Sequence, residues 1–299
     1  MEVLRTPEEC FDNLPGFSYS PNYIDDLRGY EGLRVHYVDE RPKDAIRTFL
    51  CLPGEPTWAY LYRRMIPVFA SSGARVVVPD WLGFGGSDKP VDDSVYSFDF
   101  HREMMLEFVE RLDLQNVTLV VQDWGGILGL TLPMDLNGRV SRLIVMNTAI
   151  PVGEPLGDGF QAWKEYVANR PNLNCAALMK RACPHLSEAE ALAYEAPFPD
   201  QRYKAGVRRF PQLVMIQPGM GGIETTMRAR LFWAEVWEGE SFMAVGAKDP
   251  VLGVPVMSQL QKTIRGCPEP MVLAEAGHFV QEWGEPVALA SLKFFGDIS

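Results

Sequence analysis

Short apolar runs rich in β-branched residues recur along the chain, and the intervals between them are long enough for helices. The strand candidates fall at 33–38, 48–52, 75–78, 117–121, 143–146, 242–245 and 271–273. Between the third and fourth runs, the apolar residues recur at the spacing of one helix face: Met104, Met105, Phe108, Val109 and Leu112. Alternating strands and helices predict an α/β fold, in which helices flank a mostly parallel central sheet.

The alternation stops near residue 150 and resumes near residue 241. Prolines and aromatic residues are frequent in between, together with short helical patterns such as 187–194. We predict that 150–219 form a helical cap, inserted into a single core made of 1–149 and 220–299. The alternative is a long surface excursion, but structureless loops of this length are uncommon inside compact domains.

Composition narrows the classes of partner. The formal charge of −11 and the pI near 4.9 argue against nucleic acid, which would meet a net-negative surface. The five cysteines are scattered without C-x-x-C spacing, so we expect free thiols, no metal and no cofactor. The N-terminus lacks the order of a signal peptide, and no apolar run reaches ~18 residues. We therefore expect a cytoplasmic monomer with no membrane or nucleic-acid partner.

The segment around Asp123 carries the main chemical signal. An apolar run ends at Gln122 and Asp123, and Gly125 and Gly126 open the stretch that follows, as a tight strand-to-helix turn requires. Many hydrolases place a nucleophile at the apex of such a turn, usually serine in the pattern G-x-S-x-G. Here Asp123 stands in the serine position and Val121 in that of the first glycine. Taken alone, the junction favours a simpler role for Asp123 as a helix N-cap.

Two later residues change that balance. Catalytic triads on such turns follow the chain order nucleophile, acid, histidine. Asp249 follows the strand candidate 242–245, and His278 follows 271–273. Because parallel strands end at one edge of a sheet, these two residues should meet the nucleophile there. Of the remaining histidines, His36 lies in a strand, His101 on a helix and His185 in the cap, and we expect them to be structural or solvated.

An aspartate nucleophile suits displacement of a halide from carbon. A serine attacking such a carbon would leave a stable ether, whereas Asp123 would leave an ester that water can cleave. Its carboxylate is ionised at neutral pH, so the first step needs no base. We therefore predict that His278 is the general base that activates the hydrolytic water, and that Asp249 orients the ring of His278.

The predicted intermediates need hydrogen-bond donors. Backbone N–H groups of Trp124 and Glu55 would form the oxyanion hole, since one follows the nucleophile and the other lies in the turn after strand 48–52. An indole N–H can hold a departing halide without offering a competing acceptor, which suits Trp124 and Trp163. From its position alone, Trp163 is more simply a packing residue of the cap. We assign the other tryptophans to packing: Trp58, Trp81, Trp233, Trp237 and Trp283.

These motifs resemble those of the haloalkane dehalogenases, in the subfamily whose catalytic acid lies late in the chain. The resemblance runs through 54–63, 79–80, 83–85, 121–126, 158–164, 196–200, 248–249 and 277–282. It implies an α/β-hydrolase fold with an inserted helical cap, hydrolysis of haloalkanes to alcohol, halide and a proton, and halide binding by Trp124 and Trp163. It also implies a substrate pocket lined by Phe160, Phe210, Pro211, Val214, Val251 and Leu252.

Two positions depart from the family pattern. Pro53 replaces the histidine that usually opens the His-Gly-x-Pro turn, which puts the shape of the oxyanion hole in question but not its backbone donor. Ile127 stands where an aromatic residue is often found, and the segment from Ile150 to Trp163 is short. We therefore expect a roomier pocket that favours small to medium primary chloro- and bromoalkanes.

Epoxide hydrolases are the nearest alternative, since they share the fold and an aspartate nucleophile. They protonate the epoxide through cap tyrosines, and the cap here contains Tyr166, Tyr194 and Tyr203. Fluoroacetate-type dehalogenases commonly carry arginine directly after the nucleophile, where this chain has Trp124. A non-catalytic receptor on the same fold would tolerate loss of a catalytic residue, yet all three are present.

Overall fold

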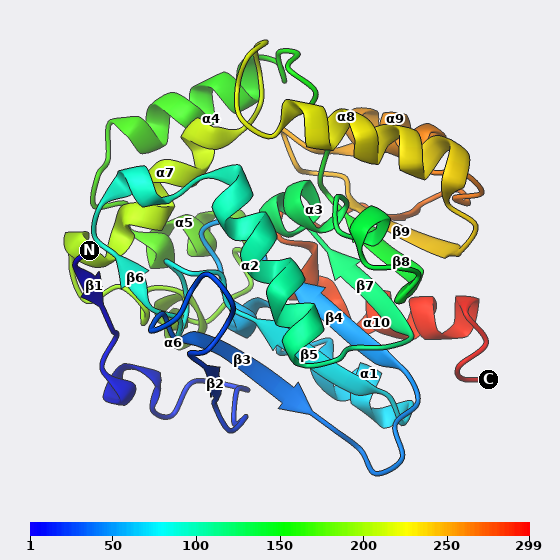
Figure 1. Cartoon of the computed structure of the whole chain (residues 1–299), viewed down its shortest axis with the longest axis horizontal. Helices are drawn as coiled ribbons and strands as arrows, with labels where there is room; N and C mark the ends of the chain where they lie inside the picture. The colour runs from blue at the N-terminus through cyan, green and yellow to red at the C-terminus, as the bar shows by residue number, and fades with distance from the viewer.

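The computed structural model describes residues 1–299 and contains an eight-stranded central sheet (Figure 1). Its strand order is β10-β9-β8-β7-β4-β5-β3-β2. The strands are β2 (Asn22–Ile24), β3 (Val35–Glu40), β4 (Thr48–Leu52), β5 (Arg75–Pro79), β7 (Val117–Val121), β8 (Val140–Met146), β9 (Glu240–Gly246) and β10 (Met271–Leu273). β3 runs antiparallel to both β2 and β5, and all other neighbours are parallel. The predicted mostly parallel sheet is therefore confirmed.

The seven predicted strands agree with the structure to within a few residues. β4, β7 and β10 have the predicted bounds, and β3, β5, β8 and β9 are shifted or longer by a few residues. Two features were missed. One is β2, and the other is a separate two-stranded sheet in which β1 (Val3–Leu4) pairs with β6 (Lys89–Pro90). β6 lies in a segment for which the sequence predicts no strand.

The sheet separates two apolar cores, because successive strand side chains point to opposite faces. In β4, Leu50 and Leu52 belong to one core, whereas Phe49 and Cys51 belong to the other. Every residue of β4 and β7 is buried, as expected for central parallel strands covered on both sides.

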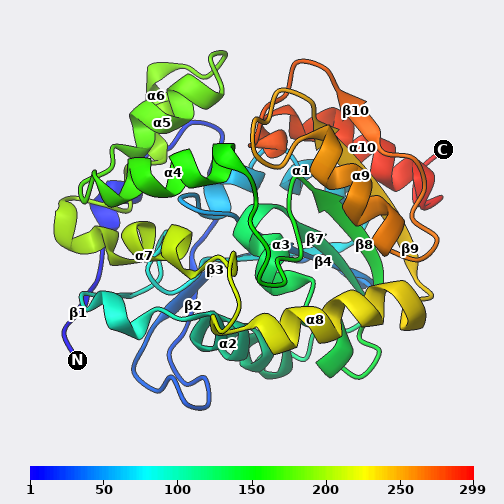
Figure 2. The same cartoon turned by 90° about the horizontal axis from the view of Figure 1, so that it is seen from above.

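Helices cover both faces of the sheet, with α2 and α3 on one side and α1 and α10 on the other (Figure 2). The helices outside the β8–β9 connection are α1 (Ile66–Ser71), α2 (Phe98–Arg111), α3 (Asp123–Gly129), α9 (Val254–Thr263) and α10 (Gly284–Phe294). α2 contains the predicted apolar face, and its N-terminus is capped by Ser97 Oγ, which accepts a 3.1 Å hydrogen bond from the Phe100 N–H.

The connection from β8 to β9 contains helices and no strand. These helices are α4 (Asp158–Ala168), α5 (Cys175–Ala182), α6 (Glu188–Ala193), α7 (Ala205–Leu213) and α8 (Ile223–Leu231). α4 and α7 lie above the carboxyl ends of the parallel strands (Figure 1). α8 continues into a π-helical turn whose Trp233 indole donates to the Leu130 carbonyl just beyond α3. The cap boundaries 150 and 219 stay a prediction.

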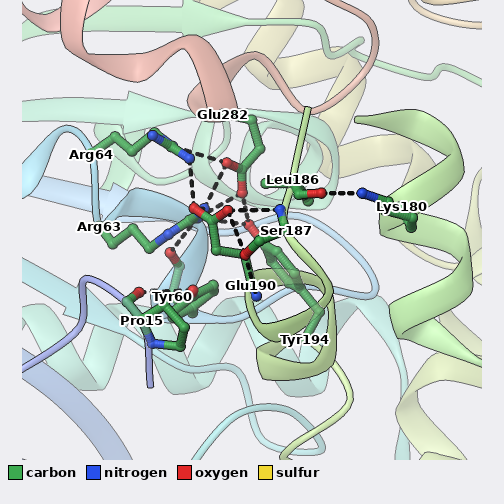
Figure 3. Close-up of polar contacts among 10 residues, drawn as sticks. All are labelled: Pro15, Tyr60, Arg63, Arg64, Lys180, Leu186, Ser187, Glu190, Tyr194 and Glu282. Carbon is green, nitrogen blue, oxygen red and sulfur yellow. Dashed lines mark hydrogen bonds and ion pairs between the residues drawn. The ribbon is translucent and has the colours of Figure 1, made fainter. Parts of the chain in front are cut away.

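A buried ion cluster joins α6 to the core (Figure 3). The Arg63 guanidinium donates to both carboxylate oxygens of Glu282, at 2.6 and 2.8 Å. Arg64 bridges Glu282 and Glu190, at 3.1 and 2.7 Å, and the Tyr194 hydroxyl also donates to Glu282. Because Arg63 and Glu282 are almost fully buried, this cluster fixes α6 against the turn that follows β10. No helix in the structure combines the length and hydropathy needed to cross a bilayer.

Candidate active site

Asp123 stands at the apex of a sharp turn between β7 and α3. Its φ of 50° lies in the left-handed region, which few residues other than glycine adopt. The turn is held by its own backbone, since the Asp123 N–H donates to the Asn147 carbonyl at 3.0 Å and its carbonyl accepts from Thr148 Oγ1 at 2.7 Å. A Cβ at Gly125 would lie 2.0 Å from the Leu52 carbonyl oxygen, so this position requires glycine.

The structure brings the three predicted triad residues together. His278 Nδ1 lies 2.8 Å from Asp249 Oδ2, and His278 Nε2 lies 3.5 Å from Asp123 Oδ2. The Asp249 carboxylate is nearly inaccessible and accepts further hydrogen bonds from the Asn147 amide at 3.0 Å and the Val251 N–H at 2.9 Å. The acid is thus locked in place behind the imidazole.

Opposite charges couple the protonation of these groups. Burial raises the pKa of Asp249, but His278 and the hydrogen bonds lower it further, so its pKa falls below the ordinary value of 3.8. Burial lowers the pKa of His278, whereas Asp249 and Asp123 raise it to about 10. Two carboxylates therefore favour the imidazolium form before any reaction has taken place.

A backbone N–H group contacts the carboxylate of Asp123, as the sequence predicts. The Glu55 N–H donates to Asp123 Oδ1 at 2.7 Å. This approach depends on Gly54, where a Cβ would lie 2.6 Å from the Asp123 Cβ. Pro53 leaves the turn intact, since its carbonyl accepts a 2.7 Å hydrogen bond from the Trp81 indole. The role of the Trp124 N–H as second donor stays a prediction.

A cavity of about 770 Å³ opens above Asp123. Trp124 and Trp163 both line it, as does Ile127, one of the departures from the family pattern. Five of the six predicted pocket residues are also in its wall: Phe160, Pro211, Val214, Val251 and Leu252. The cavity is thus bounded mainly by apolar side chains from the core and from α4 and α7.

Phe210 corrects the sixth pocket prediction. It is fully buried and absent from the cavity wall, and its ring packs against Trp124 with centroids 4.6 Å apart. Adjacent residues on a helix point in different directions, so Pro211 faces the cavity while Phe210 faces the core. Phe210 therefore supports Trp124 from behind.

The outer part of the cavity carries residues that sequence reasoning did not assign to it. Arg181, Lys248 and Glu275 are exposed residues of the lining, and Lys248 pairs with Glu275. The ring of His185, also exposed, lies 4.4 Å from that of Trp283, for which the sequence predicts packing alone. No local motif marks these residues, which come from α5, the following loop and the turns after β9 and β10.

The side chain of Glu55 is a further feature of the site, since the sequence predicts a role only for its backbone N–H. It lines the cavity at 5% exposure, and its Oε1 is buried without a hydrogen-bond partner. Burial, with the negative charge of Asp123, raises the pKa of the Glu55 carboxyl well above its usual value of 4.5. Both effects favour the neutral form of this carboxyl in the folded protein.

Glu55→Gln tests this protonation state through stability. Above about pH 4.5 the unfolded chain ionises Glu55 while the folded chain does not, so the wild type loses about 1.4 kcal/mol per pH unit until the folded pKa is reached. Glutamine has no such loss. The melting temperature of the variant should match that of the wild type near pH 4 and exceed it increasingly at higher pH. If the difference in melting temperature between the variant and the wild type is the same at every pH from 4 to 8, the pKa of Glu55 is not raised.

Comparison with known proteins agrees with this geometry. The fold and site define an α/β hydrolase, and the model of the alpha/beta hydrolase fold matches residues 47–285. A haloalkane dehalogenase from Psychrobacter cryohalolentis is 40% identical over 306 residues, covering 99% of each chain. One from Mycolicibacterium paratuberculosis is 39% identical over 288 residues, covering 94% of each.

A solved structure gives the same assignment. The tetrameric structure of haloalkane dehalogenase DpaA from Paraglaciecola agarilytica NO2 superposes with a TM-score of 0.96 at 54% identity, covering 98% of each chain. The chain belongs to the haloalkane dehalogenase family.

Proposed function

We propose that this protein hydrolyses haloalkanes to an alcohol, a halide ion and a proton, with Asp123 as nucleophile. The observation that carries the proposal is the setting of Asp123. Its carboxylate lies at the base of a mainly apolar cavity, with two tryptophans in the wall and the His278–Asp249 pair beside it. Family membership supports the same reaction.

The first step follows from the two oxygens of Asp123. Oδ1 accepts the Glu55 N–H, so Oδ2 is the oxygen available for attack. Its electron pair displaces halide from the substrate carbon, forming a C–O bond as the carbon–halogen bond breaks. The product is an alkyl ester of Asp123 and a halide anion, which the indole N–H groups of Trp124 and Trp163 would hold.

The second step releases the alcohol. His278 takes a proton from a water molecule as the water oxygen bonds to Cγ of the ester, and the oxyanion on Oδ1 receives the Glu55 N–H. The imidazolium returns the proton to the departing alkoxide. Asp123 then loses the proton of its new carboxyl group, which restores the carboxylate and accounts for the proton released overall.

Trp163→Phe tests the halide site. Phenylalanine keeps an aromatic ring beside Tyr166, whose centroid lies 5.9 Å from that of Trp163, but lacks the N–H. Because a hydrogen bond to a charged group contributes about 1.5–3 kcal/mol, bromide affinity should fall about tenfold or more. Carbon–halogen cleavage should slow as well. Quenching of tryptophan fluorescence by bromide measures the affinity.

Trp283→Phe is the matched control, because Trp283 lines the cavity beside exposed His185 and has no assigned halide contact. Its bromide affinity should stay close to that of the wild type. If Trp163→Phe binds bromide as tightly as the wild type does, Trp163 is a packing residue of the cap.

Epoxide hydrolysis is less well supported. None of the three cap tyrosines lines the cavity. Tyr194 is fully buried against Glu282, Tyr166 stacks on the ring of Trp163, and Tyr203 packs against the core. A tyrosine that protonates an epoxide must reach the substrate, so this arrangement favours the dehalogenase.

The test is release of halide and protons from 1-bromobutane by the purified protein, with an epoxide panel in parallel. Bromide release supports the proposal, and turnover of epoxides alone would move the assignment to an epoxide hydrolase. Absence of both activities would favour a receptor.

We further propose small to medium primary chloro- and bromoalkanes as substrates, and restriction to two-carbon compounds would contradict this.

We also propose that the protein is an oligomer. The tetrameric form of DpaA favours an oligomer over the monomer expected from the sequence. Light scattering on the purified protein measures the assembly. A cytoplasmic location stays a prediction from the sequence.

A further inference from the structure

Gln122, the residue directly before the nucleophile, contacts the proposed base. Its side chain is fully buried at the end of β7. The amide nitrogen lies 3.0 Å from His278 Nε2 and 3.1 Å from the main-chain carbonyl oxygen of His278. The amide oxygen faces the side-chain nitrogen of Gln281 at 3.4 Å.

The orientation of this amide follows from its partners. A main-chain carbonyl can only accept a hydrogen bond, so the Gln122 atom facing it must be the NH₂ group. The same NH₂ group faces His278 Nε2, which must then be an acceptor without a proton. Since Nδ1 faces the Asp249 carboxylate at 2.8 Å, the Gln122 and Asp249 contacts together fit a neutral imidazole that carries its hydrogen on Nδ1.

The charges around His278 act in the other direction. Asp249 and Asp123 face its two nitrogens, and the Glu55 carboxyl, expected to be neutral, lies nearby. Lys248 and Glu275, which also line the cavity, neutralise one another as an ion pair. The charge of Asp123 disappears when it becomes an ester, whereas the Gln122 amide remains in place.

We infer that Gln122 is a positioning residue for ester hydrolysis: once Asp123 is an ester, it holds His278 in its neutral form with Nε2 free of a proton. This inference rests on the proposed function. One amide hydrogen favours the unprotonated Nε2, and the other anchors the His278 main chain, so the ring keeps its place when a water molecule donates to Nε2. The residue touches neither substrate nor leaving group and acts through His278.

Gln122→Met tests the inference, because methionine has a similar length and no hydrogen-bonding amide. Rapid-quench mass spectrometry with 1-bromobutane separates formation of the alkyl-enzyme from its decay, between pH 6 and 10. Formation should change by no more than about threefold. Loss of a hydrogen bond to the neutral ring should raise the apparent pKa of the decay step by about one unit, so decay slows about tenfold at low pH and recovers at high pH.

Gln281→Met is the matched control. This substitution removes a buried amide that contacts Gln122 but leaves both hydrogen bonds from Gln122 to His278. The apparent pKa of ester decay should therefore shift less than in Gln122→Met. Equal slowing of decay by Gln122→Met at every pH, no slowing at all, or an equal shift in Gln281→Met would overturn the inference.

A second measurement leaves Gln122 unchanged, so it tests the inference even if Gln122→Met does not fold. In Asp123→Ala the carboxylate is gone, as in the ester, and Gln122 is the remaining protein partner of Nε2. Nitrogen NMR of the histidine rings at pH 7 should report His278 with a proton on Nδ1 and none on Nε2. A protonated Nε2 would overturn the inference. This readout needs no turnover, so it also separates failure of the inference from failure of the proposed function.

Discussion

Asp123→Ala should abolish halide release from bromoalkanes, with a loss of at least about 10⁴-fold, the scale seen when a catalytic nucleophile is removed. Alanine offers no oxygen to form the ester, and no other carboxylate is placed to replace it. Asp249 is sealed behind His278 by four hydrogen bonds, and Glu55 is expected to be neutral. Release of bromide from 1-bromobutane, followed by ion chromatography, measures the effect.

The control for Asp123→Ala is bromide binding, since Trp124 and Trp163 are unchanged. Retained quenching of tryptophan fluorescence by bromide would show that the cavity has formed. If halide release persists above about one hundredth of the wild-type rate while the cavity is intact, another residue is the nucleophile.

His278→Gln should divide the reaction into its two steps. Alkylation of Asp123 uses no base, so the variant should release one equivalent of halide and then stop. Hydrolysis requires proton removal from water, which glutamine cannot perform at neutral pH, so the ester should persist. Intact-protein mass spectrometry after exposure to 1-bromobutane should show the addition of one butyl group, and digestion should locate it on the peptide that contains Asp123.

Two outcomes would refute this role of His278. Continuous turnover by His278→Gln would mean that another group activates the water. Failure to release even one equivalent of halide would mean that His278 is needed for alkylation, through contact with Asp123 or with the substrate. The double variant Asp123→Ala/His278→Gln, which should form no adduct, is the control for alkylation elsewhere on the surface.

The sequence predicts seven of the eight strands of the central sheet but misses β2, β1 and β6. β4 and β7 are continuous apolar runs, because they are buried on both faces, and their bounds can be read directly. β2 has three residues and forms only by pairing with β3. β6 consists of Lys89 and Pro90, which have low strand propensity. They form a strand only because they pair with β1 near the N-terminus. Pairings of this kind leave no local pattern.

The site divides in the same way. The triad was predictable because its members follow three strands that end at one edge of the sheet. The distinction between Phe210 and Pro211 required the rotation of α7, which neighbouring elements set. The contact of Gln122 with His278 joins residues 156 positions apart, and the buried carboxyl of Glu55 gains its properties only from the packing around it. Side-chain environments of this kind arise from the assembled fold.

The left-handed backbone conformation of Asp123 lowers the stability of the folded protein at the position that catalysis requires. A residue other than glycine costs about 1 kcal/mol or more in this conformation, and glycine would relieve most of that cost. Directed evolution that scores melting temperature alone would therefore favour loss of the nucleophile itself. A screen for more stable variants of this enzyme therefore has to measure activity at every round. The substitution at this turn that relieves the strained backbone also removes the catalytic nucleophile.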